Sequence, residues 1–569
     1  MKYCIFDIET TGLNPNRKTE IFAYAFYFPE KNNVVIKRKD ADRDFIPYLQ
    51  SIFNDVSICK VCHNYKFEYS FLKRIIHIPK KTIWHCTLLM SQLLENTKLS
   101  HSLDYVFTQL TGSHQYNTID ERVSKYKKVG YDKISVPLFN EYQTADIIRT
   151  EILFSILFPE IKKDSIYKVY EMEIEFAKII SDMEDTGINL DRNNTLLLIE
   201  DMKNRFKKVQ QDVYAETGQF INLHSGKQIK ELLTKKYKFP VLQQTVKGNM
   251  QLNKDVLFEY KRMFPNLKIL DLIIQWRSYK NGISTIQSYL DIFNCYGRVN
   301  PIINPNQALT GRQSAQDPNL QNVQKPEALK NLYPVNARQC FCCDENEYLL
   351  FADYKGIEIR LMTEITGEKI YKKMIENESG DPHDYAAKIL LGERYNGEKI
   401  LRDACKNAQF AIAYAAGKKR VEKTVNLKDI DYYGFKKKLP KIGYFSRNIM
   451  HKAKNGYVET SFGRRLYLQT GMEYMIGNHL IQSTAADILK HAIIRIDKYI
   501  KDYWQGKMKM IISIHDEIIF GMKKRIFDEH GNIIIKDISL LMTTFDEIKI
   551  PLKIEWKKTE TTWDKAVKI

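Results

Sequence analysis

The pattern of apolar residues changes twice along this chain, and these changes constrain its fold. Over the first 160 residues, strand-like runs (KYCIFDIE, EIFAYAFYF, NNVVIKR) alternate with helix-like runs (DFIPYLQSIF, FEYSFLKRII, EYQTADIIRTEILFSILF), which is typical of an α/β domain. From about 165 to 295 the periodicity is helical, and after about 296 strands such as YLLFADY and MKMIISI return among helices. We therefore predict an α/β protein, α+β overall, with about two to four domains.

One segment carries strong turn signals. NPNQALTGRQSAQDPNLQNVQKP, residues 304–326, is rich in Pro and Asn and is predicted to be irregular.

The charge balance indicates a polyanionic partner. Lys and Arg outnumber Asp and Glu by 87 to 69, a formal charge of +18, which favours nucleic acid over a membrane. The Lys-rich block near 418–441 is equally compatible with an ordinary solvated face. With no run of eighteen apolar residues and no signal-peptide pattern, we expect a soluble, cytoplasmic protein, in the host cytoplasm if the source is viral.

The cysteines suggest a cofactor only when they are read literally. Cys59, Cys62 and His63 form C-x-x-C-H, the attachment motif for a c-type haem. Attachment of a c-type haem needs an exported polypeptide, and we expect this chain not to be exported. Its nine cysteines are therefore expected to be reduced. No second Cys or His pair stands at finger spacing. We expect no haem, no structural zinc and no membrane partner.

Acidic residues recur at set positions in the first region. Asp7 and Glu9 are two residues apart in a strand-like run, so both point to one face. Tyr142 and Asp146 are four residues apart in a helical run and also share a face. Glu68 adds a carboxylate in HNYKFEYSFL. Neighbouring carboxylates repel one another and are tolerated either on a solvated face or in a site where divalent cations neutralise them, and the spacing alone leaves both interpretations open.

These residues resemble the motifs of the 3′→5′ proofreading exonuclease domain that many DNA polymerases share: D-x-E, N-x-x-[FY]-D and Y-x-x-x-D. The resemblance implies an RNase H-like domain in which Asp7, Glu9, Glu68 and Asp146 hold two divalent metals and Tyr142 orients the attacking water. Glu68 stands where the family usually has Asp. Its carboxylate could contact the metal directly or through water, and the sequence therefore does not fix how strong the exonuclease activity is.

The second half places further acids at strand ends. Asp353 ends the strand-like run YLLFAD, while His515, Asp516 and Glu517 lie at the turn of MKMIISIHDEIIFGM. Two strand ends converge if the strands are neighbours in a sheet. Taken singly, an acid at a turn is more often only a turn residue.

A helical run between these strands combines charges and rings on one face. Arg402, Lys406, Phe410 and Tyr414 recur every four residues. An amphipathic helix normally separates cations from large apolar groups. The shared face suits a ligand with phosphates at one end and a flat ring at the other, such as a deoxynucleoside triphosphate.

Six motifs in order resemble the family A DNA polymerases, the group of bacterial DNA polymerase I and many phage replicases, whose compact layout this chain shares. The motifs are DYKGIEIR, RDACKNAQFAIAYAAG, IHDEIIF, TGRQSAQDPNLQNV, GYVETSFGRR and IQSTAADILK. The resemblance implies a right-hand polymerase after the exonuclease: residues 1–165 form the exonuclease, 166–295 a helical linker and thumb, and 296–569 palm and fingers. The fingers would span about 368–475, with a motif helix at about 400–416.

The resemblance also implies residue roles. Asp353, Asp516 and the Tyr354 carbonyl would hold two Mg²⁺, replaceable by Mn²⁺, with Glu517 supporting them. A nucleotide site would consist of Arg402, Lys406 (also a candidate general acid), Phe410, Tyr414, Glu358 and His383. The last is nearly as well explained as a helix-start histidine. Arg312, Asn478, Gln482 and His515 would contact primer-template DNA.

The implied function is template-directed DNA synthesis from dNTPs on a primer-template, with proofreading of single-stranded 3′ ends; replisome accessory proteins are not identifiable. Two alternatives stay open. A single-subunit RNA polymerase shares the palm, although Glu358 fills the place expected beside a ribose 2′-OH. An exonuclease with a weak or inactive polymerase half is the other, although Asp353, Asp516 and Lys406 are all present.

Overall fold

The computed structural model describes residues 2–244, 248, 250–323, 335–453 and 455–569. Its N-terminal sheet has the order β3-β2-β1-β4-β5, so β1 lies between an antiparallel and a parallel neighbour. The strands are β1 (Tyr3–Thr10), β2 (Ile21–Phe28), β3 (Asn33–Arg38), β4 (Cys59–Cys62) and β5 (Trp84–Cys86). The first three confirm predicted strands. The others span four and three residues, too few for a period-2 pattern to reveal.

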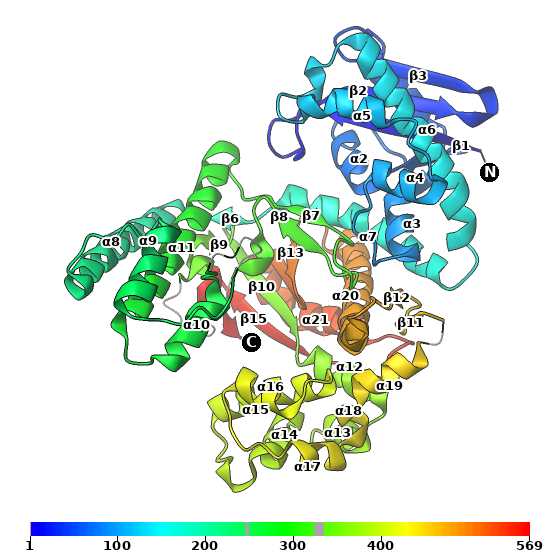
Figure 1. The fold of residues 1–569 in the computed structure, drawn as a ribbon. Helices are drawn as coiled ribbons and strands as arrows, with labels where there is room; N and C mark the ends of the chain where they lie inside the picture. Colours follow the sequence, from blue (N-terminus) through cyan, green and yellow to red (C-terminus); the bar gives the residue numbers. More distant parts are fainter. Residues whose placement is uncertain (1, 245–247, 249, 324–334, 454) are drawn as a thin grey trace.

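Six helices accompany this sheet (Figure 1). They are α1 (Phe45–Asn54), α2 (Tyr65–Leu72), α3 (Thr87–Leu94), α4 (Leu103–Thr111), α5 (Asn117–Ser124) and α6 (Val136–Ile161). The 26-residue α6 contacts β1, β2 and β4. Side chains on its inner face therefore reach the carboxylates of the central strand.

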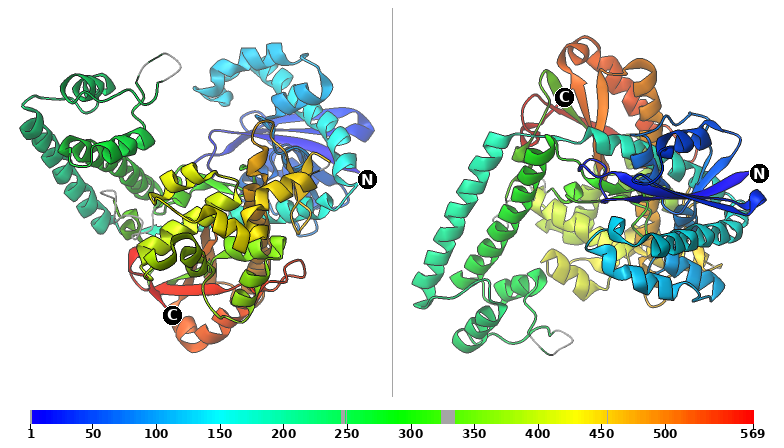
Figure 2. Two further views of the ribbon diagram at one scale, coloured as in Figure 1. Left: turned by 60° about the horizontal axis from the view of Figure 1, so that its bottom comes forward. Right: turned by 90° about the horizontal axis from the view of Figure 1, so that it is seen from above.

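The middle of the chain is helical, as the periodicity predicts. It consists of α7 (Ile166–Thr186), α8 (Arg192–Thr217), α9 (Gly226–Glu231) with a π-helical turn at Leu232–Lys236, α10 (Lys254–Met263) and α11 (Lys268–Tyr296). Helices α8 and α11 pack against each other and extend as a long pair away from both sheets (Figure 2). Helix α7 contacts α2 on one side and α20 (Ile476–Tyr503) on the other.

The second sheet has the order β13-β14-β10-β15-β16. Its strands are β10 (Glu347–Tyr354), β13 (Met508–Ile514), β14 (Glu517–Lys523), β15 (Ile554–Thr559) and β16 (Val567–Lys568). Strand β10 pairs antiparallel with both β14 and β15. Helices α20 and α21 (Lys524–Thr543) pack beside this sheet.

A lobe of short helices follows β10 (Figure 1). It contains α12 (Ile357–Thr366), α13 (Lys369–Glu376), α14 (Pro382–Leu391), α15 (Lys399–Ala413), α16 (Lys418–Val425), α17 (Tyr432–Lys438), α18 (Pro440–Gly443) and α19 (Phe445–Lys452). Helix α15 ends three residues before the expected 416, because Ala415 takes a left-handed φ of 65° that an α-helix cannot contain.

The segment predicted to be irregular contains a short strand and a 3₁₀ helix at Leu320–Asn322. Residues Ser314–Gln316 form β8, which pairs with β7 (Ile302–Asn304), so the prediction is wrong there; residues 324–326 lie outside the described range. Two further small sheets pair β6 (Asn189–Leu190) with β9 (Phe341–Cys342) and β11 (Tyr457–Glu459) with β12 (Arg465–Tyr467).

Most buried apolar side chains of both five-stranded sheets and of α7 form one continuous cluster, while Phe22 and Ala23 of β2 belong to a smaller second cluster. The two halves of the chain are therefore joined through a shared core. Across the described residues, no helix combines the length and the apolar character that a membrane crossing needs.

A buried histidine makes the N-terminal region sensitive to acid. His85 in β5 is 5% exposed, and its ring lies 4.6 Å from that of Phe158. Burial, reinforced by Lys162, lowers the pKa of His85 to about 4. The unfolded chain takes up this proton near pH 6.5 and the folded protein only near 4. The stability that neutral His85 contributes is thus complete above pH 6.5 and is lost as the pH falls toward 4.

We predict that protonation of His85 removes about 2 kcal/mol from the free energy of unfolding between about pH 7.5 and about pH 5, which lowers the melting temperature relative to a variant without this histidine. The variant His85→Gln does not titrate and should show a smaller fall. His530→Gln, at a histidine whose side chain is 44% exposed, is the matched control and should keep the parent's pH dependence. Equal pH dependence in the parent and His85→Gln would contradict the assignment.

Candidate active sites

The first candidate site lies on β1 beneath α6. Asp7, Glu9 and Asp146 place one carboxylate oxygen each within 4.8 Å of one another. Asp7 and Glu9 share a face because side chains alternate along a strand, and α6 supplies Asp146. The sequence prediction that these three acids converge is confirmed.

Gln143 bridges two of these acids. Its amide nitrogen donates to Asp7 Oδ2 at 2.9 Å and to Glu9 Oε1 at 3.0 Å. A neutral donor shared by two carboxylates reduces their repulsion without cancelling their charge. Sequence analysis missed this residue, although its place three residues before Asp146 puts both on one face of α6.

Arg149 provides the one cation bonded to these acids among the described residues. Its guanidinium, 3% exposed, donates to Asp146 Oδ1 at 3.0 Å and to both carboxylate oxygens of Asp120, at 3.0 and 2.5 Å. Asp120 comes from α5, so Arg149 ties α5 to the acid cluster. No sequence motif signals this pair, whose members are 29 residues apart.

The cluster holds more negative charge than its surroundings compensate. Burial is the main cause that raises the pKa of Asp7 to about 6 and, together with Asp7, the pKa of Asp146 to about 7. The pKa of Glu9 is also raised, by burial and by both of the other acids. Desolvated carboxylates of this kind favour a bound cation, which would restore their charged form.

Glu68 lies beside these acids but outside the closest group. It is 3% exposed and its carboxylate accepts a hydrogen bond from the Ile8 amide of β1. Its Oε2 is buried without a hydrogen-bond partner among the described residues. Burial, then Asp7 and Glu9, raise its pKa, so Glu68 shares their electrostatic environment.

Tyr142 lies over the acids from α6. It hydrogen-bonds to Glu9 and Asp146 and thereby lowers their pKa values against the effect of burial. Its ring meets that of Tyr131 edge-on at 5.6 Å. The hydroxyl therefore points toward Glu9 and Asp146.

The second candidate site lies where β10 and the β13-β14 hairpin end together. Asp353 is the direct partner of Glu517 across the antiparallel pair. The Tyr354 amide donates to the Asp516 carbonyl at 3.2 Å, which holds the turn against β10. Tyr354 buries its side chain and donates its hydroxyl to the Met542 carbonyl at 2.7 Å. The predicted convergence of Asp353, Asp516 and Glu517 is therefore observed.

Helix α15 carries three of the four residues of the predicted stripe. Tyr414 caps its end, and the Phe410 and Tyr414 rings stack at 6.0 Å. Arg402 pairs with Asp381 (Nε to Oδ2, 3.1 Å), Asp403 (3.2 Å) and Asp384 (3.5 Å). Three carboxylates thus compensate the charge of this arginine.

His383 stands in the first turn of α14 and is 6% exposed. Its Nδ1 lies 2.6 Å from the Gln409 side-chain nitrogen, and Gln409 accepts from Tyr371 at 2.9 Å. Burial lowers the pKa of His383 to about 4, so it is neutral at pH 7. The geometry accords with the helix-start interpretation, and a phosphate contact would fall to the other ring nitrogen.

Glu358 faces the loop that precedes the second sheet. Its Oε1 lies 3.7 Å from an Arg312 nitrogen. After burial, Glu358 is the largest cause that raises the pKa of Tyr414, while Arg312 lowers it. Arg312, Glu358 and Tyr414 are therefore electrostatic neighbours.

The remaining predicted DNA contacts occupy two places. Asn478 and Gln482 hydrogen-bond to each other at 3.1 Å on the first turns of α20. His515 lines a cavity of about 30 Å³ with Arg312 and Lys490. His515 has a φ of 57° in the two-residue turn between β13 and β14, a conformation rare for a non-glycine residue.

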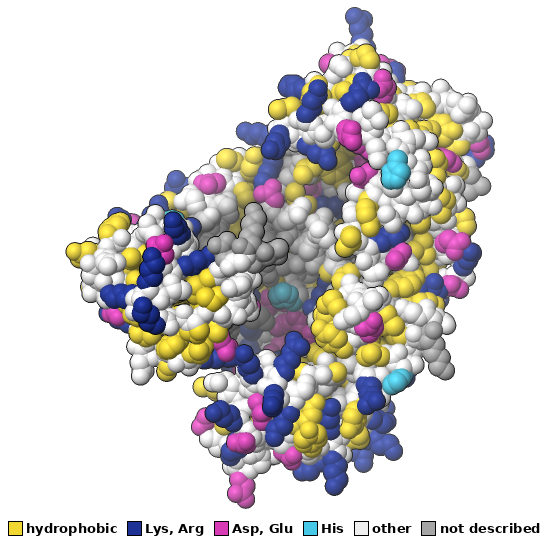
Figure 3. Space-filling model, in the orientation of Figure 1, with side chains coloured by type: hydrophobic (Ala, Val, Ile, Leu, Met, Phe, Trp, Pro, Cys, Tyr) yellow, Lys and Arg dark blue, Asp and Glu magenta, His cyan; other side chains and the backbone are white. Residues whose placement is uncertain are grey.

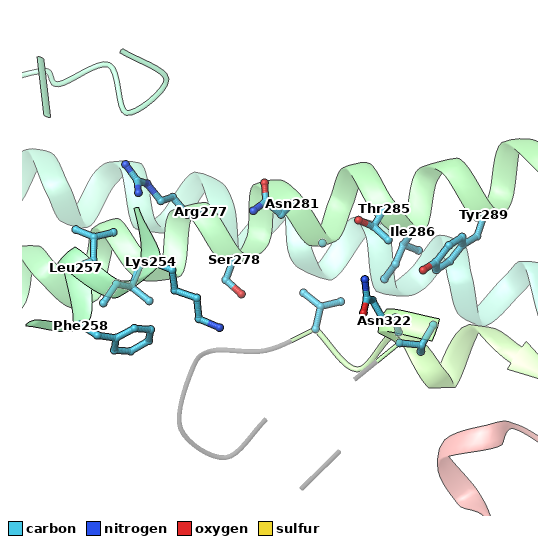
Figure 4. Close-up of a pocket in the computed structure, with 15 residues that line it drawn as sticks. Lys254, Leu257, Phe258, Arg277, Ser278, Asn281, Thr285, Ile286, Tyr289 and Asn322 are labelled. Carbon is cyan, nitrogen blue, oxygen red and sulfur yellow. The ribbon is translucent and has the colours of Figure 1, made fainter. Parts of the chain in front are cut away.

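The space-filling view shows a deep cleft between the lobes (Figure 3). Acidic side chains and a histidine lie at its floor, and Lys and Arg side chains line its sides. A separate hollow of about 420 Å³ lies along α10 and α11, with Lys254, Arg277 and Asn281 among its lining (Figure 4). None of the described residues around it is acidic, so it offers no carboxylate to a metal.

Two family models match successive parts of the chain. The family described as DNA polymerase family A matches residues 194–565, and the family described as 3′-5′ exonuclease matches residues 1–162. A solved structure, the POL domain of Pol1 from M. smegmatis in complex with DNA primer-template and dNTP, shares the fold with a TM-score of 0.80. It is 20% identical and covers 99% of this chain and 96% of that chain.

Curated relatives are similar over most of the sequence. DNA polymerase I of Pseudomonas aeruginosa is 25% identical over 99% of this chain and 63% of its own length. DNA polymerase I of Rhizobium leguminosarum is 25% identical over 92% of this chain and 53% of its own length. The chain thus spans between half and two thirds of these relatives. With a family match across most of its length, the chain belongs to DNA polymerase family A.

Proposed function

We propose that this protein extends a DNA primer on a template strand with dNTPs and removes mispaired 3′ ends with its N-terminal site. The observation that carries the proposal is the pairing of Asp353 with the Asp516–Glu517 turn, in a chain whose helix α15 carries Arg402, Lys406 and Phe410. A basic chain of charge +18 suits a DNA partner. The family match supports the same reaction.

The donor sets of both sites fit hard divalent cations, which bind oxygen ligands. Asp7, Glu9, Asp146 and, directly or through water, Glu68 would hold Mg²⁺ in the N-terminal site. Asp353, Asp516 and the Tyr354 carbonyl would hold it in the other. We propose two ions per site, with Mn²⁺ as a substitute. When bound, the ions activate an attacking oxygen and neutralise charge on the leaving group.

The protein's own groups would orient the substrates. Arg402 would exchange its three aspartate partners for the triphosphate, and Lys406 would contact it and donate a proton to pyrophosphate. Phe410 would pack on the sugar and base, Tyr414 would lie near the template, and Glu358 would fill the space beside C2′. Arg312, Asn478, Gln482 and His515 would contact the primer-template from the minor groove.

In the N-terminal site, Tyr142 would orient the attacking water through its hydroxyl. Its hydrogen bonds to Glu9 and Asp146 support this role. The substrate would be a single-stranded DNA 3′ end.

We propose that the chain divides into an exonuclease (1–165), a linker and thumb (166–295), and palm and fingers (296–569, fingers 368–475). We also propose that the protein acts in the cytoplasm, or in the host cytoplasm if the source is viral, where DNA and dNTPs meet.

The two activities should be separable, because their acids lie on different sheets. Asp7→Ala with Glu9→Ala should abolish digestion of single strands and leave extension within about twofold, whereas Asp353→Ala should abolish extension and spare digestion. Extension is measured by a primer-extension assay with Mg²⁺ that compares dNTPs with ribonucleotides. Digestion is measured on single-stranded DNA with Mg²⁺. Failure of the parent to extend a primer would contradict the proposed function, and preference for ribonucleotides would favour an RNA polymerase.

Arg149 should support digestion by holding Asp146. Arg149→Lys keeps one charge but loses the forked donor that binds Asp120 and Asp146 together. We expect digestion to fall about tenfold, as a loss of about 1.4 kcal/mol would give, while extension is unchanged. Arg122→Lys, at an exposed pair with Glu141 (2.8 Å) between the same two helices, is the control. An unchanged rate in Arg149→Lys would remove this role.

Phe410 should make the enzyme discriminate against dideoxynucleotides. A normal substrate has a 3′-OH that bonds to its own phosphate oxygens, and phenylalanine has no hydroxyl to replace a missing one. The under-satisfied polar atoms should cost about 1 to 3 kcal/mol. In the Asp7→Ala, Glu9→Ala background, Phe410→Tyr should largely remove the discrimination in single-nucleotide incorporation. Equal use of both substrates by the Phe410 enzyme would show that α15 does not face the sugar.

A further inference from the structure

Four charged side chains are buried together between α7 and α20, which lie side by side (Figure 1). Glu173, Arg464, Asp487 and Lys490 are each at most 2% exposed, and we call them the buried charge cluster. Arg464 donates to Asp487 Oδ1 at 2.7 Å and also to Glu173. Lys490 donates to Glu173 at 2.5 Å. Two cations and two anions leave the cluster neutral, which buried charges require.

The Arg464 guanidinium lies directly against the loop that carries Arg312. Gly311 has a φ of 71°, and a Cβ there would come within 2.8 Å of Arg464 Cζ and Nη1. Arg464 Nη1 also donates to Asn306 Oδ1 at 3.2 Å. The guanidinium therefore fills the space under the loop, and only glycine leaves room for it.

Hydrogen bonds hold the rest of this loop. The Gly311 amide donates to the Ala308 carbonyl at 2.8 Å, which closes the turn. Ser483 Oγ donates to the Thr310 carbonyl at 2.7 Å, and Gln313 donates to the Ser513 carbonyl at 3.0 Å. The loop is thus attached to α20 and β13, and Arg464 is the group beneath its glycine.

Arg312 leaves this fixed turn toward the second candidate site. It reaches Glu358 at 3.7 Å and shares a small cavity with His515 and Lys490. A shift of Gly311 would move the Arg312 backbone with it. Misplacing a contacting group by about 1 Å can lower a rate about a hundredfold.

Glu173 belongs to α7, between the residues matched by the two families, 1–162 and 194–565. It accepts from both cations of the cluster. Without it, Arg464 would keep Asp487 as its only carboxylate partner among the described residues, and the cluster would carry an uncompensated buried charge.

We infer that Arg464 is a positioning residue for DNA synthesis: held by Glu173 and Asp487, it sets the turn at Gly311 and thereby the placement of Arg312 at the primer end. This role presupposes the proposed DNA synthesis. The connecting helix α7 then contributes to the polymerase site although neither family match includes Glu173.

A double-mutant cycle tests whether Arg464 acts through Arg312. Arg464→Lys keeps the charge but loses the planar fork. We expect it to lower the rate of single-nucleotide addition about tenfold in the parent and less than about twofold in the Arg312→Ala background, because effects through a shared residue are not additive. Glu173→Gln with Lys490→Met, which also keeps the cluster neutral, is measured in parallel and should behave in the same way.

Lys501→Ala is the matched control. Lys501 of α20 pairs with Asp182 of α7 at 3.6 Å, far along both helices from the loop, and its loss should leave extension unchanged. Melting temperature and single-strand digestion report whether the variants fold. Losses that multiply with that of Arg312→Ala would show that the cluster only joins two helices and would overturn the role. A parent that extends no primer would overturn the proposed function and this role with it.

Discussion

The cost of removing carboxylates from water governs both halves of this molecule. A buried anion needs a compensating partner, and the chain meets this need to different degrees. Glu173 and Asp487 are matched by Arg464 and Lys490, so their cluster is neutral and acts as a support. Around Asp7, Glu9 and Asp146 the described residues supply only the Gln143 amide, the Tyr142 hydroxyl and one arginine that is shared with Asp120. Incomplete compensation therefore distinguishes the site that would take cations from the cluster that would not.

Helix α7 joins the two halves by presenting buried acids to both. Glu173 meets the cations beside α20, while Glu184 pairs with Lys66 of α2 and accepts the Ile303 amide. The same helix belongs to the continuous apolar core. Because its anions have partners on either side, α7 is connected both to the cluster under the Arg312 loop and to α2 of the N-terminal region.

Local periodicity predicts the residues proposed to perform the chemistry. It does not reveal the residues whose hydrogen bonds and ion pairs keep these side chains and loops in position. Alternation along a strand puts Asp7 and Glu9 on one face, and helical spacing joins Tyr142 to Asp146, so their convergence follows from the sequence. Arg149 and Asp120 are 29 residues apart, and Glu173 and Arg464 are 291 apart; such pairs depend on tertiary packing. Tyr414 was placed on the helix because spacing alone does not reveal the left-handed Ala415 that ends it.

Glu68 shows how packing accommodates a departure from a motif. An aspartate on α2 would present its carboxylate one methylene closer to its own backbone. The longer Glu68 reaches β1, where it accepts the Ile8 amide between Asp7 and Glu9. That bond fixes the extra rotamer freedom of the longer side chain, which otherwise costs entropy on ordering. Its Oε2 stays buried without a hydrogen-bond partner among the described residues, so the glutamate keeps an acceptor oxygen beside the acids while its carboxylate is anchored to the strand that bears Asp7 and Glu9.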